Sequence, residues 1–166
     1  MKWLAKASAI FDRILGILVF LASVIFMFGV VLVASDVVSR YFFHRPIIWS
    51  VEITEYSLLY ITFLGAAWLL KEEGHVKVDV VLNELNQRNQ ALVNVITSIL
   101  GAMVCLVIAW YGAEITLDHF QRGIPAIEIL HTPYFIILGI IPVGSFLLFI
   151  QFLRRTHKYL KDRRAL

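Results

Sequence analysis

The sequence predicts an all-α integral membrane protein with four transmembrane helices, and three observations lead to this fold class. Of the 166 residues, 60% are apolar and 16% are charged, whereas a soluble domain has about 45–50% apolar and about 25% charged residues. Four apolar segments are each long enough to cross the hydrocarbon core of a bilayer, for which a helix needs about 20 residues. Most of the positively charged residues gather beyond the ends of these segments.

The four predicted spans form a single membrane domain over residues 1–166 and cover about residues 14–35, 51–70, 91–113 and 133–153. The first span carries no charge from Ile14 to Ala34 and ends in a polar segment instead of a small-residue cleavage site. We therefore expect a retained span and not a signal peptide. The lead before it, residues 1–13, mixes basic and apolar residues and is predicted to lie at the cytoplasmic interface.

Helix-breaking and capping residues set the boundaries of the second span. Pro46 interrupts the helical pattern, because proline lacks a backbone N–H and fixes φ. Ser50 is predicted to cap the N-terminus of the following helix, and Gly74 is predicted to close its C-terminus. From Val80 to Arg88, apolar and polar residues fall on opposite faces, which predicts a short interfacial helix on the cytoplasmic side.

The third span carries a stripe of small and weakly polar residues, which is typical of membrane helices that pack closely. The stripe consists of Asn94, Thr97, Ser98, Gly101 and Cys105. Residues 114–131 are predicted to be a polar connection. Thr132 and Pro133 then predict the cap and the first residue of the fourth helix.

The distribution of positive charge predicts that both ends of the chain are cytoplasmic, a topology written N-in/C-in. With the N-terminus inside, 12 of the 15 Lys and Arg residues fall on the cytoplasmic side. The three that fall outside are Arg40, Arg45 and Arg122. This asymmetry follows the general excess of Lys and Arg in cytoplasmic loops.

The segment from Arg40 to Asp79 joins charged residues to a membrane helix more closely than any other part of the chain. Ionisable groups at a bilayer boundary are costly, so they usually have a partner or a function. Glu52 and Glu55 share a helix face, and Arg40 follows Asp36 by four residues. The segment supplies the candidate residues of a charge cluster or subunit interface: Arg40, Trp49, Glu52, Glu55, Gly65, Ala66, His75 and Asp79.

The two glutamates allow three interpretations. They are solvated at the outer interface, paired with Arg40, Arg45 or a partner subunit, or engaged in proton transfer. Gly65 and Ala66, in the middle of the second span, offer a close-packing surface for another subunit. His75 is interpreted as a structural hydrogen-bonding residue.

Several function classes lack the residues that they require. Cys105 is the single cysteine, which excludes an intrachain disulfide and a CxxC redox pair. All five histidines lie outside the uncharged runs, so none is placed to ligate haem within the membrane. The sequence assigns no catalytic, metal-binding or substrate-binding residue and no cofactor. The C-terminal basic cluster is expected to contact anionic membrane lipid, and no nucleic-acid-binding pattern accompanies it.

The segment around the second span resembles a known transporter family. The matching residues, in this order, are Arg40-Tyr41, Pro46, Trp49-Ser50, Glu52, Leu64-Gly65-Ala66-Ala67 and His75-Val76-Lys77-Val78-Asp79, and Thr132-Pro133-Tyr134 and Pro142-Val143-Gly144 resemble that family's last helix. The family is the small permease subunit of tripartite ATP-independent periplasmic (TRAP) transporters. The likeness covers nearly the whole chain and is sharpest from Trp49 to Asp79, whereas the outer helices match in pattern only.

This resemblance implies a multi-pass protein of the bacterial inner membrane that is not an enzyme. It implies a scaffold subunit for sodium-coupled symport of an organic acid anion. A large permease subunit would bind substrate and sodium, and a periplasmic binding protein would deliver the substrate. Two alternatives remain, a self-contained four-helix proton-coupled small exporter and a membrane oxidoreductase. The exporter would need an acid near mid-membrane, whereas Glu55 lies close to the helix start.

Overall fold

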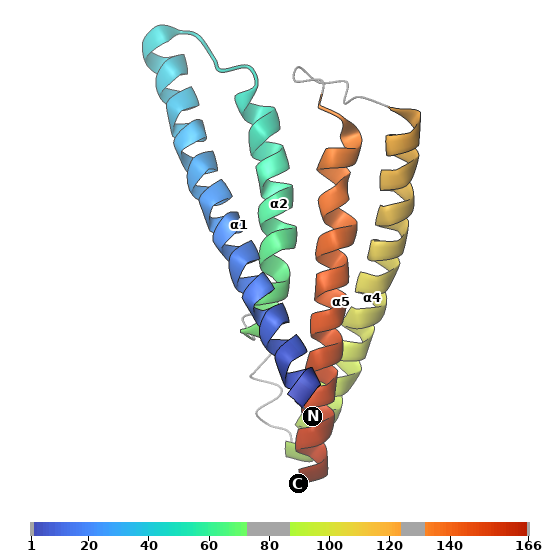
Figure 1. Ribbon diagram of the computed structural model, residues 1–166. Coiled ribbons are helices and arrows are strands. Elements are labelled where there is room, and N and C mark those ends of the chain that lie inside the picture. The colour runs from blue at the N-terminus through green and yellow to red at the C-terminus, as the bar shows by residue number, and fades with distance from the viewer. Residues whose placement is uncertain (1, 73–86, 124–131, 166) are drawn as a thin grey trace.

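The computed structural model describes residues 2–72, 87–123 and 132–165, and these ranges contain four long helices (Figure 1). They are α1 (Lys2–Phe43), α2 (Ser50–Lys71), α4 (Gln87–Arg122) and α5 (Tyr134–Ala165), and no strand occurs in these ranges. Each helix is long and apolar enough to cross a membrane. The predicted all-α fold is confirmed, and the chain is a multi-pass membrane protein.

Some predictions fall on residues that the structure does not describe. They concern most of the interfacial helix at residues 80–88, the helix-closing Gly74, and the candidate residues His75 and Asp79. The interfacial helix and the N-in/C-in topology stay predictions.

Three helices extend beyond the predicted apolar spans. α1 begins at Lys2 and includes the lead that the sequence predicts as a separate interfacial segment. α4 continues to Arg122, so the predicted polar connection is wrong for residues 114–122. Charged residues mark the end of an apolar span in the sequence, but they do not end the helix, because Lys, Arg and Glu are good helix formers. α4 stops before Gly123, whose φ of 59° is a left-handed conformation that glycine adopts without strain.

The start of α2 differs from the prediction. Trp49, and not Ser50, occupies the N-cap position, and it makes no side-chain capping hydrogen bond. The Ser50 hydroxyl instead hydrogen-bonds to the carboxylate of Asp36 in α1. The capping prediction is wrong because a contact between helices uses the hydroxyl that a local cap would need.

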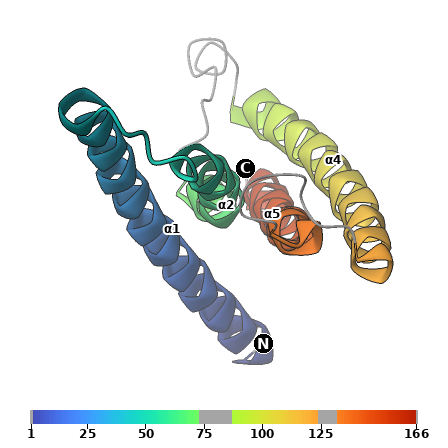
Figure 2. The same cartoon turned by 90° about the horizontal axis from the view of Figure 1, so that it is seen from above.

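The four helices lie side by side in one layer, in the order α1, α2, α5, α4 (Figure 2). α1 packs on α2, α2 on α5, and α5 on α4. α1 begins and α5 ends at the same end of the layer (Figure 1). Large apolar side chains remain exposed, among them Phe20 at 67% and Trp110 at 72%. In a membrane, lipid or another protein must cover these surfaces.

The centre of the layer is the contact between α2 and α5. Ala22 of α1, Leu64 of α2 and Ile140 of α5 form its buried core cluster. Gly144 of α5 lies against Phe63 of α2, where an added Cβ would be 2.6 Å from the Cβ of Phe63. Real Cβ atoms do not approach so closely, so this helix contact requires a glycine.

Candidate functional site

Near the end of α1, the carboxylate of Asp36 ties the helix to the turn that follows. One oxygen accepts a hydrogen bond from the backbone N–H of Ile47 at 2.7 Å. The other pairs with Nε of Arg40 at 2.9 Å, the contact that their four-residue spacing favours. Asp36 is only 7% exposed, and these groups together with the Ser50 hydroxyl compensate its buried charge. We call Asp36, Arg40, Ile47 and Ser50 the turn tie.

The two glutamates of α2 lie in different surroundings. Glu52 is buried, with 8% exposure, whereas Glu55 is exposed. Arg40 directs its Nε to Asp36 and keeps 53% of its side chain exposed. The pairing of either glutamate with Arg40 or with a partner subunit stays a prediction.

Trp49 belongs to a group of exposed apolar residues around the α1–α2 turn. Their exposed fractions run from 44% to 77%, and the group comprises Tyr41, Phe42, Phe43, Ile48 and Trp49. Aromatic side chains are enriched where membrane meets water, because their rings suit the headgroup layer. The surroundings of Trp49 therefore fit a place in the aromatic belt.

At the opposite end of α1, Arg154 of α5 binds three residues of the first helix. Its guanidinium donates two hydrogen bonds to the carboxylate of Asp12, at 2.9 and 3.2 Å, and one to the Ser8 hydroxyl at 2.6 Å. It also lies 5.0 Å from the ring centroid of Phe11, a cation–π distance. Lys71 of α2 lies 3.9 Å from the same carboxylate. This terminal tie, made of these five residues, joins three helices.

Sequence reasoning missed the terminal tie, because it treated the C-terminal basic residues as an orientation and lipid-binding signal. One signal was present in the sequence. Asp12 is the first acidic residue of the chain, and the next is Asp36. A lone carboxylate at a membrane boundary needs a partner, but its position in the sequence does not show which basic residue provides it.

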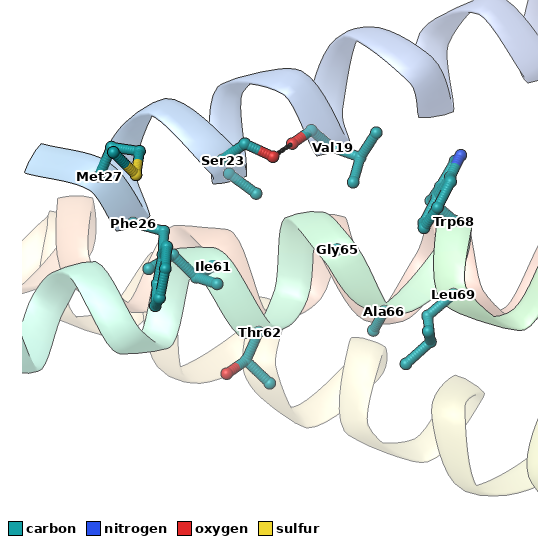
Figure 3. A pocket seen from close by; sticks show the side chains of 11 residues that line it. Val19, Ser23, Phe26, Met27, Ile61, Thr62, Gly65, Ala66, Trp68 and Leu69 are labelled. Carbon is teal, nitrogen blue, oxygen red and sulfur yellow. Dashed lines mark hydrogen bonds between the residues drawn. The ribbon is translucent and has the colours of Figure 1, made fainter. Parts of the chain in front are cut away.

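Gly65 and Ala66 line an apolar groove between α1 and α2, with a volume of about 650 Å³. Figure 3 shows α1 residues such as Phe26 on one side of this groove and α2 residues such as Trp68 on the other. An added Cβ at Gly65 would meet no atom within 4 Å. Both small residues that the sequence singled out therefore lie at an open groove.

A second apolar groove, of about 390 Å³, follows the same two helices toward the α1–α2 turn. Phe26 and Ile61 line both grooves. Gly29 lines the second groove, and an added Cβ there would again meet no atom within 4 Å. We call the two grooves together the α1–α2 trough.

The small-residue stripe of α4, by contrast, packs against α5 except at Thr97, which is exposed. Ser98 is fully buried, and Asn94 and Cys105 are 8% and 9% exposed. An added Cβ at Gly101 would lie 2.7 Å from the ring of Phe152 in α5. This stripe serves close packing inside the chain.

The ties, the trough and the small-residue stripe suit contacts between helices more than a catalytic or metal-binding site. In the three described ranges, no group of three or more His, Cys, Asp and Glu residues could hold a metal ion. The two polar ties hold α1 near its ends, and the trough between them is lined mostly by apolar side chains.

Comparison with known proteins identifies relatives that are named as permease proteins of TRAP transporters. A Haemophilus influenzae protein with the provisional name "TRAP transporter small permease protein" is 33% identical over 100 residues, which are 57% of this chain and 62% of that protein. The chain thus spans about three fifths of that relative's length. The ectoine TRAP transporter small permease protein TeaB of Halomonas elongata is 24% identical over 149 residues, 86% of this chain and 76% of the relative.

A third relative is a longer protein. The sialic acid TRAP transporter permease protein SiaT of Haemophilus influenzae is 24% identical over 128 residues, which are 77% of this chain but 20% of the relative. The family profile described as "Tripartite ATP-independent periplasmic transporters, DctQ component" matches residues 29–161, from within α1 to near the end of α5. Since this match covers most of the chain and the relatives agree with it, the protein belongs to the DctQ component family, the small permease subunits of TRAP transporters.

Proposed function

We propose that the protein is the small scaffold subunit of a sodium-coupled TRAP symporter that imports an organic acid anion. A large permease subunit binds substrate and sodium in this proposal, and a periplasmic binding protein delivers the substrate. Family membership is the observation that carries it. The names of two relatives support a carboxylate-bearing substrate, because ectoine and sialic acid both contain a carboxylate, although only sialic acid is a net anion at neutral pH.

The course of the helices supports a scaffold role. Each of the four described helices runs without interruption from its first to its last residue. Secondary transporters bind substrate and ions where helices are broken near mid-membrane, because unwound backbone supplies polar groups there. The α1–α2 trough is lined mostly by apolar side chains, and its hydroxyl groups are bonded within their own helices, so it offers little to hold an anion. We therefore assign the substrate and ion sites to the large subunit.

We further propose an N-in/C-in topology in the inner membrane of a bacterium. The bias of 12 cytoplasmic against three external Lys and Arg residues supports this orientation. Reporter fusions after Lys71 and at the C-terminus should give a cytoplasmic signal, and a fusion at Gly123 should give a periplasmic one. A cytoplasmic signal at Gly123 would refute the topology.

Reconstitution of the three components in liposomes tests the function. Uptake of a labelled carboxylate under an inward sodium gradient should require this subunit, the large subunit and the binding protein together. Omission of this subunit, or replacement of sodium by choline, should abolish uptake. Full uptake by the large subunit and the binding protein alone would contradict the proposal.

A further inference from the structure

Glycines in the two halves of the layer have different surroundings. An added Cβ at Gly101 of α4 would lie 2.7 Å from the ring of Phe152 in α5, and one at Gly144 of α5 would lie 2.6 Å from Phe63 in α2. An added Cβ at Gly16, Gly29 or Gly65, all in α1 or α2, would meet no atom within 4 Å. Glycine is less favourable than alanine inside a helix, and packing within this chain does not explain its presence at these three positions.

Two of these open glycines lie in the α1–α2 trough, one in each groove. Gly65 lines the groove of about 650 Å³, and Gly29 lines the groove of about 390 Å³. On α2 the trough reaches from Thr54 to Leu69. These residues are 15 positions apart, which corresponds to about 22 Å along a helix.

The hydroxyl groups of the trough are already bonded within their own helices. Ser23 donates to the carbonyl of Val19 at 2.9 Å, as the dashed line in Figure 3 shows, and Thr62 donates to the carbonyl of Leu58 at 2.8 Å. Thr54 and Ser57 make the same kind of bond, to the carbonyl four residues earlier. With these donors satisfied and the remaining side chains mostly apolar, the trough suits an apolar occupant.

The length of the trough distinguishes a helix from a lipid chain. One leaflet is about half of the roughly 30 Å hydrocarbon core, so an acyl chain reaches about 15 Å from its headgroup. A trough of about 22 Å crosses the midplane, as a transmembrane helix does. Backbone exposed at Gly29 and Gly65 allows such a helix to approach closely.

The relatives indicate which chain supplies this helix. The region of the sialic acid TRAP transporter permease protein that resembles this chain is a fifth of that protein, so it lies within a longer permease polypeptide. A membrane-embedded permease is therefore the neighbour to expect. Held at its ends by the turn tie and the terminal tie, α1 keeps the trough in place.

We propose that the α1–α2 trough seats one apolar transmembrane helix of the large permease subunit, with Gly29 and Gly65 at the points of closest approach. This inference rests on the proposed function, because it takes the large subunit as the partner. It goes further by assigning the contact to one face of two helices.

Leucine substitutions at the trough glycines test the proposed contact with the large subunit. Gly65→Leu and Gly29→Leu place a bulky side chain in the trough, and each should reduce co-purification of the co-expressed large subunit at least tenfold. Gly16→Leu is the matched control, because Gly16 is equally open but lines neither groove. It should leave co-purification unchanged. Insertion and size-exclusion profiles of each variant expressed alone should match the parent protein, which shows that the loss is not a folding defect.

Photo-cross-linking provides a second test that needs no disruptive change. A photoreactive amino acid at Met27, which lines the trough and is 61% exposed, should cross-link to the large subunit. The same amino acid at Phe20, which is 67% exposed and lines neither groove, should not.

Three results would overturn the inference. They are normal co-purification of both trough variants, equal loss in the Gly16→Leu control, and loss of tightly bound phospholipid in Gly65→Leu, seen by native mass spectrometry, with assembly preserved. The last result would assign the trough to an acyl chain. If the parent protein itself fails to co-purify with a large subunit, the proposed function fails, and this outcome is distinct from the other three.

Discussion

The α4–α5 pair and the α1–α2 pair use small residues in opposite ways. Between α4 and α5, Gly101 receives the ring of Phe152, and Ser98 is fully buried. Between α1 and α2, Gly29 and Gly65 border an open trough. Gly101 and Ser98 are thus used for contacts within the chain, although an apolar groove of about 320 Å³ also lies between α4 and α5. Gly29 and Gly65 instead border a surface that is open to a second molecule. A small residue in a membrane helix therefore marks a close approach without showing whether the partner belongs to the same chain.

The largest effect should come from a methyl group added where helices already touch. Gly144→Ala places a Cβ 2.6 Å from the Cβ of Phe63 and 2.9 Å from its carbonyl oxygen. Overpacking typically costs about 1–3 kcal/mol, so the thermal unfolding temperature of the purified subunit should fall. Gly65→Ala should leave that temperature unchanged or raise it, because alanine is the better helix former. Equal destabilisation by the two changes would show that a glycine at a contact between helices and a glycine at the open trough do not differ in packing.

Arg154→Ala should have the next largest effect, because it leaves the carboxylate of Asp12 with Lys71 at 3.9 Å. Stranding one member of a buried pair costs about 3–5 kcal/mol, and a surface pair is worth about 0–1 kcal/mol. Both side chains are 31% exposed, so we expect an intermediate loss of about 2 kcal/mol. A double-mutant cycle with Asp12→Asn, followed by thermal unfolding, measures the pair. Strictly additive losses would show that the Arg154–Asp12 pair contributes no coupling energy to stability.

Within the turn tie, Asp36→Ala should destabilise the protein more than Arg40→Ala. Loss of Asp36 leaves the half-buried N–H of Ile47 without its acceptor, and we expect a cost near the lower end of the about 1–3 kcal/mol of a fully buried donor. Arg40 is 53% exposed, and a surface pair is worth about 0–1 kcal/mol. The yields of folded subunit and of assembled complex measure both effects. The reverse order would indicate a further partner for Arg40, such as Glu52 or a residue of the large subunit.

The smallest effect should follow Glu55→Gln. Glu55 is exposed on α2, and a scaffold subunit has no need of its charge for transport. Assembly, uptake and the dependence of uptake on sodium concentration should match the parent protein. A changed sodium or proton stoichiometry with preserved assembly would place this subunit in the ion path.

The four helices could be predicted because an apolar run of about 20 residues has one low-cost structure in lipid, with its backbone groups bonded inside the helix. Their ends could not be predicted, since the charged residues that close an apolar span continue the helix to Lys2 and to Arg122. The single-layer arrangement could not be predicted either. Helices that are apolar on all sides carry no stripe that indicates their neighbours, because lipid is as apolar as leucine.

In the candidate site, contacts between residues close in the sequence could be predicted, whereas contacts between distant residues could not. Asp36 and Arg40 are four residues apart on one helix, and this spacing alone predicts that their side chains meet. Asp12 and Arg154 are 142 residues apart, and no periodicity connects them. Gly65 could be recognised as a close-packing residue, but only the structure shows that it borders an open trough.

The terminal tie also sets an order in the synthesis of the chain. Asp12 leaves the ribosome 142 residues before Arg154, and at about 5–20 residues per second this interval lasts roughly 7–28 s. During it, the rest of α1, all of α2 and α4 and most of α5 are made while the carboxylate of Asp12 still lacks its main partner. The last helix therefore supplies the contact that holds the start of the first. A chain that stops short of Arg154 lacks the hydrogen bonds from Arg154 to Asp12 and Ser8.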